Sequence, residues 1–329
     1  MGRTINMPDL HLERWLRTMH RIRAAEERIA AWVESGLART PCHLYIGQEA
    51  VATGVCSVLG RSDQVWGNHR SHGHFLAKGG DLTAMLMEVL CRAPGCSGGR
   101  GGSMHLLARD IGILGTVPIV GATVPLAIGG AMAMKARKDG LVSVAFFGDG
   151  CVEEGHVGES MNIAAVYRLP CVFIIENNLY SSHMHLRERR VKDNIHEMAS
   201  LYGMPGEVVD GNDVEAVAAA AARAAIRARA GDGPSLIECR TFRWRGHVGH
   251  RMDMDVGVWR KGELAEWLGK CPIKRLTERM LAHGATPEAI EHIAGDAAQE
   301  VSIAAAAAEA APPPAPSTLL DHVYAEAKR

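Results

Sequence analysis

Short apolar runs alternate with longer stretches of mixed polarity along most of the chain, a pattern typical of a parallel sheet covered by helices. Residues 141–147 and 171–175 are two such runs, rich in β-branched and aromatic residues, and they predict buried parallel strands. The helix-like stretch 154–167 lies between them and ends before Pro170. A strand, a crossover helix and a parallel strand form a βαβ unit, so the two strands are expected to end at the same edge of one sheet.

The same reading predicts further elements on both sides of this unit. Residues 10–34 carry apolar side chains at helical spacing among many charges and stop before Gly36, which predicts a long amphipathic helix. The alanine-rich stretch 214–230 predicts another helix, capped by the polar residues 210–213 that precede it. Residues 235–240 predict another strand.

The C-terminal part of the chain reads as helical. Residues 259–301 predict helices with polar faces, and the alanine- and proline-rich residues 304–316 are expected to join two terminal helices. We therefore expect one α/β domain over residues 1–329, with a mostly parallel sheet flanked by helices. A helical arm is expected at about residues 1–40 and a helical extension at about residues 259–329.

Composition and charge exclude several classes of protein. The formal net charge is −1, which gives no electrostatic reason to expect a nucleic-acid partner. The sequence lacks a run of 18 apolar residues, so no membrane span is expected, and its first residues lack the apolar core of a secretion signal. The eight cysteines are scattered, mostly among apolar residues, and predict buried free thiols of a protein in the reducing cytoplasm.

Polar residues follow both strands of the βαβ unit. Gly148-Asp149-Gly150 comes directly after the first strand, and Asn177-Asn178 after the second. Ligands of parallel sheets bind beyond the carboxyl ends of the strands. A carboxylate and an amide oxygen there suit magnesium, which takes its remaining ligands from phosphate and water. Taken singly, each piece is better explained as a turn or a loop; together, each following an apolar strand, they favour a metal site.

This spacing resembles the motif of the thiamine diphosphate enzymes, in which Gly-Asp-Gly and Asn-Asn enclose somewhat under thirty residues. Here the two pieces enclose 26 residues, 151–176. The resemblance implies that Asp149, Asn178 and the backbone carbonyl of Tyr180 hold the magnesium ion against the cofactor's diphosphate. It also implies that residues in and beside the motif contact the cofactor, namely Gly148, Asp149, Gly150, Cys151, Asn178 and Tyr180.

Residues 65–74, VWGNHRSHGH, place several imidazoles around one arginine in a glycine-flanked loop. The planar guanidinium of Arg70 can meet two phosphate oxygens at once, which favours a diphosphate clamp. A histidine in this loop can equally be a structural hydrogen-bonding residue. The family has Tyr-Arg or His-Arg here, so the resemblance assigns Arg70 to the diphosphate and makes His69 a further candidate cofactor contact.

Residues 43–50, HLYIGQEA, open a predicted helix that runs to Leu59. Gln48 and Glu49 are either site residues or first-turn polar residues that complement the helix dipole. The octapeptide resembles the alpha subunit of the 2-oxoacid dehydrogenase branch of the family, which makes His43 a candidate catalytic residue. In that branch the glutamate that activates the cofactor comes from the beta subunit, so Glu49 is not assigned that role.

Two glycine-rich stretches follow. Residues 95–105, GCSGGRGGSMH, lack the Gly-Lys-Ser/Thr ending of a P-loop. In the family the matching stretch is an ordered loop near the entrance to the active site, which makes His105 a candidate channel residue. Residues 115–130 read as a tight turn and a buried helix, and the resemblance implies that the backbone of Pro118 and Val120 grips the cofactor's aminopyrimidine.

The last candidate segments lie beyond the metal motif. Residues 179–195 are charged and turn-rich and predict a loop over the cofactor site, with Arg187, Arg189 and Arg190 solvated or in contact with a partner. Arg243-Trp244-Arg245-Gly246-His247 resembles the branch's Arg-x-x-Gly-His stretch, whose histidine reaches the diphosphate and the substrate. His247 is therefore a candidate for both catalysis and cofactor binding. Val248 stands where regulated members carry a phosphorylated serine.

Together these motifs resemble the alpha subunit of a thiamine diphosphate- and magnesium-dependent 2-oxoacid dehydrogenase. The resemblance implies decarboxylation of a pyruvate-like 2-oxoacid on the thiazolium carbon and transfer of the acyl group to a lipoyl-bearing acyltransferase. It also implies a site shared with a beta subunit in an α2β2 tetramer. Three alternatives stay open: an acetoin dehydrogenase, a non-oxidative acyloin- or transketolase-like enzyme, and a non-catalytic scaffolding subunit. A nicotinamide dehydrogenase is disfavoured because no strand-led Gly-x-Gly-x-x-Gly opens a helix.

Overall fold

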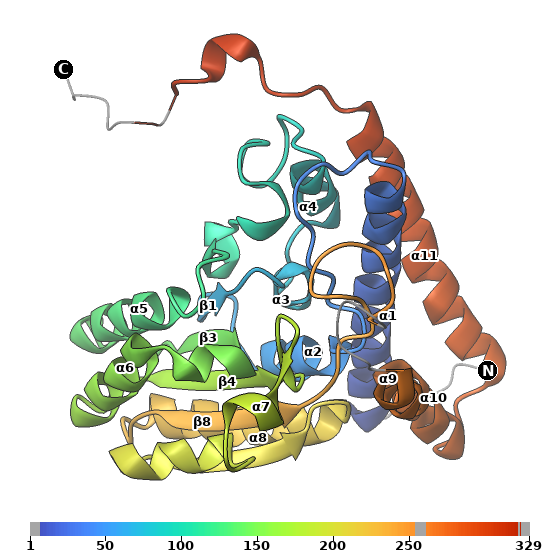
Figure 1. Cartoon of the computed structure of the whole chain (residues 1–329). Coiled ribbons are helices and arrows are strands. Elements are labelled where there is room, and N and C mark those ends of the chain that lie inside the picture. Colours follow the sequence, from blue (N-terminus) through green and yellow to red (C-terminus); the bar gives the residue numbers. More distant parts are fainter. Residues whose placement is uncertain (1–6, 254–260, 322, 324–329) are drawn as a thin grey trace.

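The computed structural model describes residues 7–253, 261–321 and 323, and its centre is a six-stranded sheet in the order β2-β1-β3-β4-β8-β7 (Figure 1). Every neighbouring pair of strands in this sheet is parallel. The mostly parallel α/β fold expected from the sequence is thus confirmed. The strands are β1 (Gln64–Gly67), β2 (Ile113–Thr116), β3 (Ser143–Gly148), β4 (Cys171–Asn177), β7 (Gly206–Asp210) and β8 (Ser235–Arg240).

Helices pack on both faces of the sheet and beside it. The α-helices among the described residues are α1 (Met7–Glu34), α2 (Glu49–Ser57), α3 (His72–Ala77), α4 (Leu82–Val89), α5 (Thr123–Arg137), α6 (Gly155–Val166), α7 (Leu186–Arg189), α8 (Val214–Arg229), α9 (Lys261–Gly269), α10 (Pro272–Ala282) and α11 (Pro287–Ala310). None of the helices in this part of the chain is long and apolar enough to cross a membrane.

Alternate side chains of the central strands enter two separate cores. Val144 and Phe146 of β3 belong to the core that includes α2 and α8, whereas Ala145 and Phe147 belong to the core that includes α5 and α6. Successive residues of a strand point to opposite faces, so a strand covered on both sides must be apolar throughout. This explains why β3 and β4 read as unbroken apolar runs.

Several predicted elements are confirmed closely. The βαβ unit is β3, α6 and β4, and the amphipathic N-terminal helix is α1. The helix expected to run from the HLYIGQEA stretch to Leu59 is α2, which ends at Ser57. The side chain of Asp213 caps α8 by accepting hydrogen bonds from the backbone N–H groups of Glu215 and Ala216, at 3.1 and 3.2 Å.

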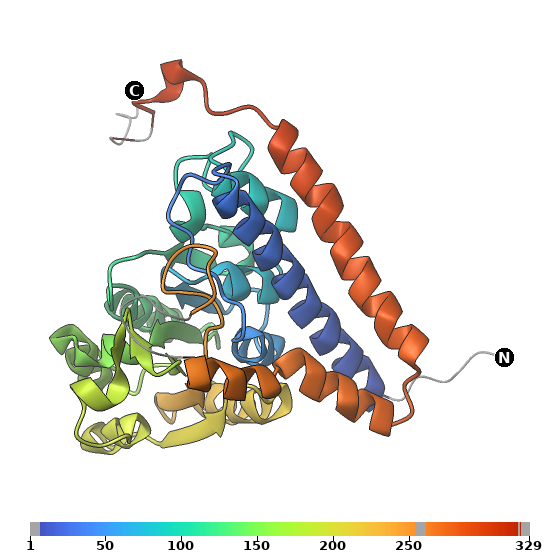
Figure 2. The same cartoon turned by 45° about the vertical axis from the view of Figure 1, so that its right-hand side comes forward.

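The two long helices α1 and α11 lie side by side (Figure 2). The prediction that residues 304–316 join two terminal helices is wrong, because Ala304–Ala310 are the last turns of α11 and residues 316–318 form only a 3-10 turn. Alanine has the highest helix propensity, and Ala304, Ala305 and Ala308 are buried against the core, so the helix continues. The predicted start of the C-terminal helices at Trp259 lies outside the described residues.

The cysteines are free thiols, as expected: Cys42, Cys56, Cys151, Cys171 and Cys239 are buried and the other three are half-buried. Burial raises the pKa of most of them, to about 11 for Cys42 for instance, which keeps these thiols protonated.

The glycine-rich segment after α4 wraps around a buried carboxylate. Glu88 Oε2 accepts hydrogen bonds from the backbone N–H groups of Ser97 and Gly99, and Oε1 accepts them from Gly101 and Gly102, at distances from 2.7 to 3.0 Å. Gly99 and Gly102 have positive φ angles of 72° and 61°, which favour glycine. The segment does bind an anion through its backbone, but the anion is the chain's own glutamate.

Replacing Glu88 with glutamine is expected to lower the free energy of unfolding by at least about 2 kcal/mol, because the new NH2 group would face two backbone N–H donors. Urea unfolding followed by circular dichroism measures this effect. Glu278→Gln, on the exposed face of α10, is the matched control and should change stability little. Equal stability of the two variants would show that the carboxylate does not organise this segment.

Candidate functional site

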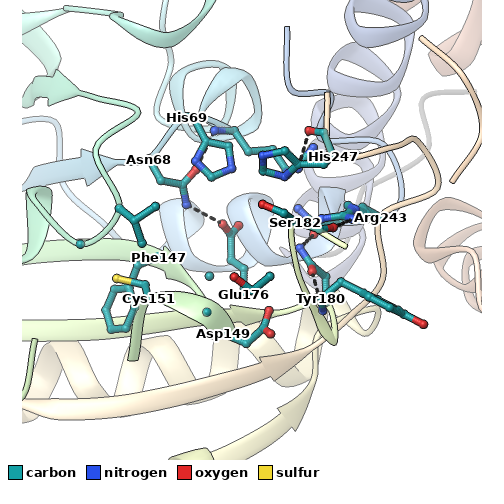
Figure 3. Close-up of a pocket in the computed structure, with 18 of the residues that line it drawn as sticks. Asn68, His69, Phe147, Asp149, Cys151, Glu176, Tyr180, Ser182, Arg243 and His247 are labelled. Carbon is teal, nitrogen blue, oxygen red and sulfur yellow. Dashed lines mark hydrogen bonds between the residues drawn. The ribbon is translucent and has the colours of Figure 1, made fainter. Parts of the chain in front are cut away.

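The candidate site lies where the direction of strand addition reverses. The chain proceeds from β1 to β2 on one side of the sheet and from β3 to β4 on the other, so the loops after β1 and β3 diverge. Such a switch point leaves a crevice beyond the carboxyl ends of the strands. A cleft lies here, between the segments that follow β1, β3 and β4 (Figure 3).

Most candidate residues from the sequence line this cleft. Those that do are His69, Arg70, Val120, Gly148, Asp149, Gly150, Cys151, Asn178, Tyr180 and His247. Three candidates lie elsewhere. Pro118 is half-buried just before the turn that carries Val120, and the ring of His43 lies behind His69 and His247. His105 is exposed, and its Nδ1 contacts the backbone oxygen of Gly101 at 3.0 Å.

Oxygen atoms suited to a hard cation meet at the ends of β3 and β4. The two strands pair in register with Gly148 opposite Glu176, which puts Asp149 and Asn178 beside each other just beyond the sheet. Both side chains are buried. Asn178 Oδ1 accepts a hydrogen bond from the backbone N–H of Tyr180 at 3.3 Å. A carboxylate, an amide oxygen and a nearby carbonyl are the ligand types that magnesium takes from proteins.

Glycine is required beside these oxygens. A Cβ atom at Gly150 would lie 2.4 Å from Ser181 Oγ, so no larger residue fits between the end of β3 and the hairpin formed by β5 (Tyr180–Ser181) and β6 (Met184–His185). A Cβ atom at Gly148 would meet nothing within 4 Å. The backbone at Gly148 is therefore open to the cleft and lets a ligand approach closely.

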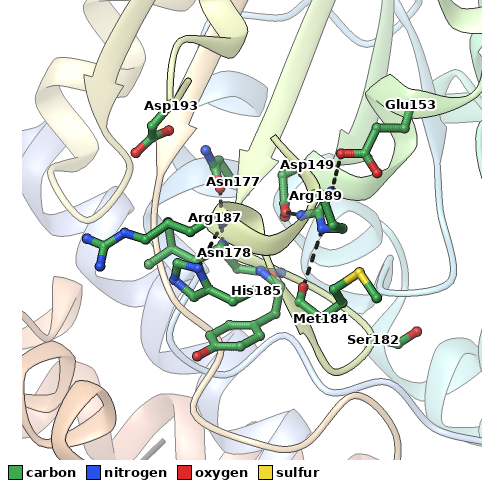
Figure 4. Close-up of polar contacts among 12 residues, drawn as sticks. Asp149, Glu153, Asn177, Asn178, Ser182, Met184, His185, Arg187, Arg189 and Asp193 are labelled. Carbon is green, nitrogen blue, oxygen red and sulfur yellow. Dashed lines mark hydrogen bonds and ion pairs between the residues drawn. The ribbon is translucent and has the colours of Figure 1, made fainter. Parts of the chain in front are cut away.

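Arg189 occupies the position next to Asp149 (Figure 4). It lies at the end of α7, with only 6% of its side chain exposed, and donates hydrogen bonds to Asp149 and, at 2.5 Å, to Glu153. The expectation that Arg189 is solvated or contacts a partner is wrong, because the hairpin before α7 turns the side chain inward. Arg187 is exposed, as expected, and points away from Asp149 (Figure 4).

The pair has an electrostatic consequence for Asp149. Burial raises the pKa of the Asp149 carboxyl, and the charge and hydrogen bond of Arg189 oppose that shift. The guanidinium therefore favours the ionised carboxylate in the absence of another cation. A metal ion at Asp149 would have to take the place of Arg189.

Arg70 is a buried cation without a carboxylate partner among the described residues. It donates hydrogen bonds to two backbone oxygens, those of Leu44 at 2.6 Å and His247 at 3.1 Å. Burial, followed by the charge of Arg243, lowers the pKa of Arg70 to about 9. A positive charge held this way at the wall of a cleft favours an anionic ligand, since an anion would offset the cost of its burial.

Three imidazole rings from distant segments pack together beside Arg70. The ring centroid of His43 lies 4.6 Å from that of His69 and 5.0 Å from that of His247, and His69 and His247 are 5.4 Å apart. Burial, and then the charge of Arg70, lowers the pKa of His43 to about 3 and that of His69 to about 2. Both rings are therefore neutral near pH 7.

These two histidines are expected to make folding stability fall as the pH drops below about 6.5. An unfolded histidine takes up a proton near pH 6.5, whereas the folded protein keeps both rings neutral until close to their lowered pKa values. In that window each ring lowers the free energy of unfolding by up to about 1.4 kcal/mol per pH unit, and above it the two rings have no effect.

Urea unfolding of His69→Gln at several pH values between about 5 and 7 measures this slope. The free energy of unfolding should fall less steeply with falling pH for the variant than for the wild type. The two slopes should differ by up to about 1.4 kcal/mol per pH unit, the effect of one proton. His292→Gln, on the exposed side of α11, is the control. Identical slopes for the wild type and His69→Gln would contradict a lowered pKa for His69.

The turn before α5 and the helix itself differ from expectation in one respect. Residues 115–130 were expected to form a tight turn and a buried helix, but only one side of α5 is buried. Ile119 and Val120 in the turn and Leu126 and Met132 on the helix are 40% to 70% exposed. The apolar composition of this stretch therefore reflects an uncovered apolar face as well as the core.

Glu49 has a structural role. It is fully buried, accepts hydrogen bonds from Arg23 at 2.6 Å and from the backbone N–H of Gly47, and does not line the cleft. This agrees with leaving it out of the candidate catalytic residues.

Several residues that line the cleft were not expected from the sequence, among them Asn68, Glu176 and Arg243, and Gln48 had been left open as a site residue. Asn68 directly follows β1, and Glu176 is the last but one residue of β4. A polar residue at the carboxyl end of a parallel strand was the available signal for both. Glu176 accepts hydrogen bonds from Tyr45, from His74 at 2.9 Å and from Asn68 at 3.4 Å.

Comparison with known proteins identifies relatives over nearly the whole chain. Residues 17–317 match the family model described as the dehydrogenase E1 component. The alpha subunit of acetoin:2,6-dichlorophenolindophenol oxidoreductase from Bacillus subtilis is 39% identical over 307 residues, which are 93% of this chain and 91% of that protein. The pyruvate dehydrogenase E1 component subunit alpha from Zymomonas mobilis is 39% identical over 311 residues, 93% of this chain and 86% of that protein.

Proposed function

The chain belongs to the dehydrogenase E1 component family, and on that premise we propose how its cleft holds the cofactor and what it acts on. It is the alpha subunit of a thiamine diphosphate-dependent 2-oxoacid dehydrogenase and has a beta subunit as its partner. When bound, thiamine diphosphate supplies the electron sink for carbon–carbon bond cleavage, with a divalent metal on its diphosphate. The residues described below would bind and orient that cofactor.

Asp149, Asn178 and the carbonyl of Tyr180 would hold magnesium. The observation that carries this proposal is the placement of a buried carboxylate and a buried amide side by side beyond β3 and β4, on the wall of one cleft. Gly148, Gly150 and Cys151 would pass close to the diphosphate, because the backbone at Gly148 is open to the cleft.

Arg70 and His247 would hold the diphosphate, and His69 lines the same cleft beside His247. Support comes from the buried charge of Arg70, which has no carboxylate partner among the described residues. The backbone of Pro118 and Val120 would contact the aminopyrimidine. His247 lines the cleft and would face the substrate, which gives it a place in catalysis, and the neutral ring of His43 packs against it at 5.0 Å and would orient it.

We propose pyruvate or a closely similar 2-oxoacid as the substrate, with acyl transfer to a lipoyl-bearing acyltransferase. Acetoin is the second candidate, because a relative named for acetoin and one named for pyruvate are equally similar to this chain, at 39% identity each. Both substrates would undergo carbon–carbon bond cleavage in the same cleft.

The beta subunit would complete the cleft within an α2β2 tetramer. Support comes from exposed apolar side chains near the cleft: Val120 lines it, Leu126 lies on α5, and Ile163 and Val166 lie on α6, which packs against α5. Exposed apolar residues on neighbouring elements favour a protein interface there. The free cysteines further support a reducing, cytoplasmic compartment.

Reconstitution of the chain with its candidate beta subunit tests the proposed function. The complex, supplied with thiamine diphosphate and magnesium, should reduce 2,6-dichlorophenolindophenol with pyruvate or with acetoin, and the ratio of kcat/KM values would decide between the two substrates. Activity that releases an acyloin without an electron acceptor would indicate a non-oxidative enzyme. Cofactor binding without any turnover would indicate a scaffolding subunit.

A further inference from the structure

Gln48 is a buried polar residue that lines the cleft. The oxygen of its side-chain amide forms a hydrogen bond, whereas the nitrogen forms none among the described residues. Gln48 precedes α2 at the N-cap position, yet its side chain makes no capping hydrogen bond, so the helix does not account for it. Its Oε1 accepts a hydrogen bond from Asn178 Nδ2 at 3.0 Å. Its Nε2 is buried and has no hydrogen-bond partner among the described residues.

The contact fixes which end of the Asn178 amide faces the metal ligands. A primary amide that rotates by half a turn exchanges its oxygen and its NH2 group. Since Nδ2 of Asn178 donates to Gln48, Oδ1 points the other way, toward the backbone N–H of Tyr180 at 3.3 Å. The oxygen is thus kept on the side of Tyr180, whereas the flipped amide would present NH2 to a cation.

The buried Nε2 group of Gln48 requires a hydrogen-bond acceptor. A buried N–H group without a partner costs about 1–3 kcal/mol, so such groups in native proteins usually mark a missing ligand or water. Gln48 Nε2 and the unpaired charge of Arg70 belong to the same cleft. An oxyanion bound there would satisfy both.

From these contacts we infer that Gln48 is a positioning residue: it holds the Asn178 amide with its oxygen toward the metal and donates a hydrogen bond to a phosphate oxygen of the cofactor. This inference rests on the proposed function, because it assumes that magnesium and a diphosphate occupy the cleft. Gln48 therefore couples the metal site to the anion site.

The test is calorimetric titration of thiamine diphosphate at several magnesium concentrations into the alpha–beta complex carrying Gln48→Met. Loss of a hydrogen bond to a charged group corresponds to a 10- to 100-fold weaker cofactor affinity, at about 1.4 kcal/mol per tenfold. The magnesium concentration for half-maximal binding should rise as well, because Asn178 is no longer held. Gln64→Met is the matched control, since Gln64 also has an unpaired buried amide oxygen but lies at the start of β1, away from the cleft.

Gln48→Glu separates a positioning role from a merely structural one. A glutamate that is ionised at high pH has no donor, whereas the protonated form regains an O–H donor and a carbonyl acceptor. Cofactor affinity of Gln48→Glu should therefore recover as the pH is lowered, in contrast to Gln48→Met. This pH profile also keeps the inference testable if Gln48→Met folds poorly.

The two proposals fail in different ways. If the wild-type complex does not bind the cofactor, the proposed function is wrong. If the wild type binds but Gln48→Met and Gln64→Met match it in affinity and in magnesium dependence, or if Gln48→Glu shows no recovery at low pH, only the role of Gln48 is overturned.

Discussion

Replacing Asp149 with asparagine is expected to weaken magnesium-dependent binding of thiamine diphosphate at least about 100-fold. The substitution keeps the shape of the side chain and removes its charge. Asp149 is the only carboxylate of the proposed ligand set, and magnesium depends on such a charge to release its bound water. Calorimetric titration of the alpha–beta complex measures the change.

Asp139→Asn provides the control for this variant. Asp139 lies before β3, outside the cleft, and pairs with Arg137. Its loss should leave cofactor affinity unchanged. Retention of wild-type affinity and magnesium dependence by Asp149→Asn would show that Asp149 is not a metal ligand.

Replacing Arg189 with glutamine is expected to tighten cofactor binding in the presence of magnesium by roughly 10- to 100-fold. The guanidinium of Arg189 donates hydrogen bonds to Asp149 and Glu153. A metal ion at Asp149 must break the first of these bonds, and a hydrogen bond between charged groups contributes about 1.5–3 kcal/mol. Removing the arginine removes that cost, at about 1.4 kcal/mol per tenfold. The measurement is again calorimetric titration of the complex.

Arg187→Gln is the matched control, since Arg187 lies on the same short helix but is exposed. Its affinity should equal that of the wild type. Limited trypsin digestion gives an independent readout, because displacement of Arg189 should change cleavage in the segment around α7 when cofactor and magnesium are added. Weaker cofactor binding by Arg189→Gln would instead make Arg189 part of the binding site.

The sequence predicted those parts of the site that depend on strand ends. Asp149 and Asn178 follow apolar runs that predicted buried parallel strands, and neighbouring parallel strands end at one edge. Arg70 was predictable for the same reason, as it follows β1 at the switch point of the sheet.

Contacts between segments far apart in the chain could not be predicted in this way. The ion pair of Arg189 with Asp149 depends on the direction of a short hairpin, and Gln48 reaches Asn178 across 130 positions. Likewise, the glycine-rich segment 95–105 lacks the ending of a P-loop, and only the fold reveals that its backbone binds the carboxylate of Glu88. Local pattern fixes the type of each element, whereas tertiary packing decides which side chains meet.

Titration of thiamine diphosphate into the alpha–beta complex, with magnesium and separately with a chelator in its place, tests most directly whether this cleft holds the cofactor and its metal. We expect saturable binding that requires magnesium and that reaches one cofactor for each alpha subunit. Binding of equal strength in the presence of the chelator, or no binding in either condition, would contradict the assignment of this cleft as the site of the cofactor and its metal.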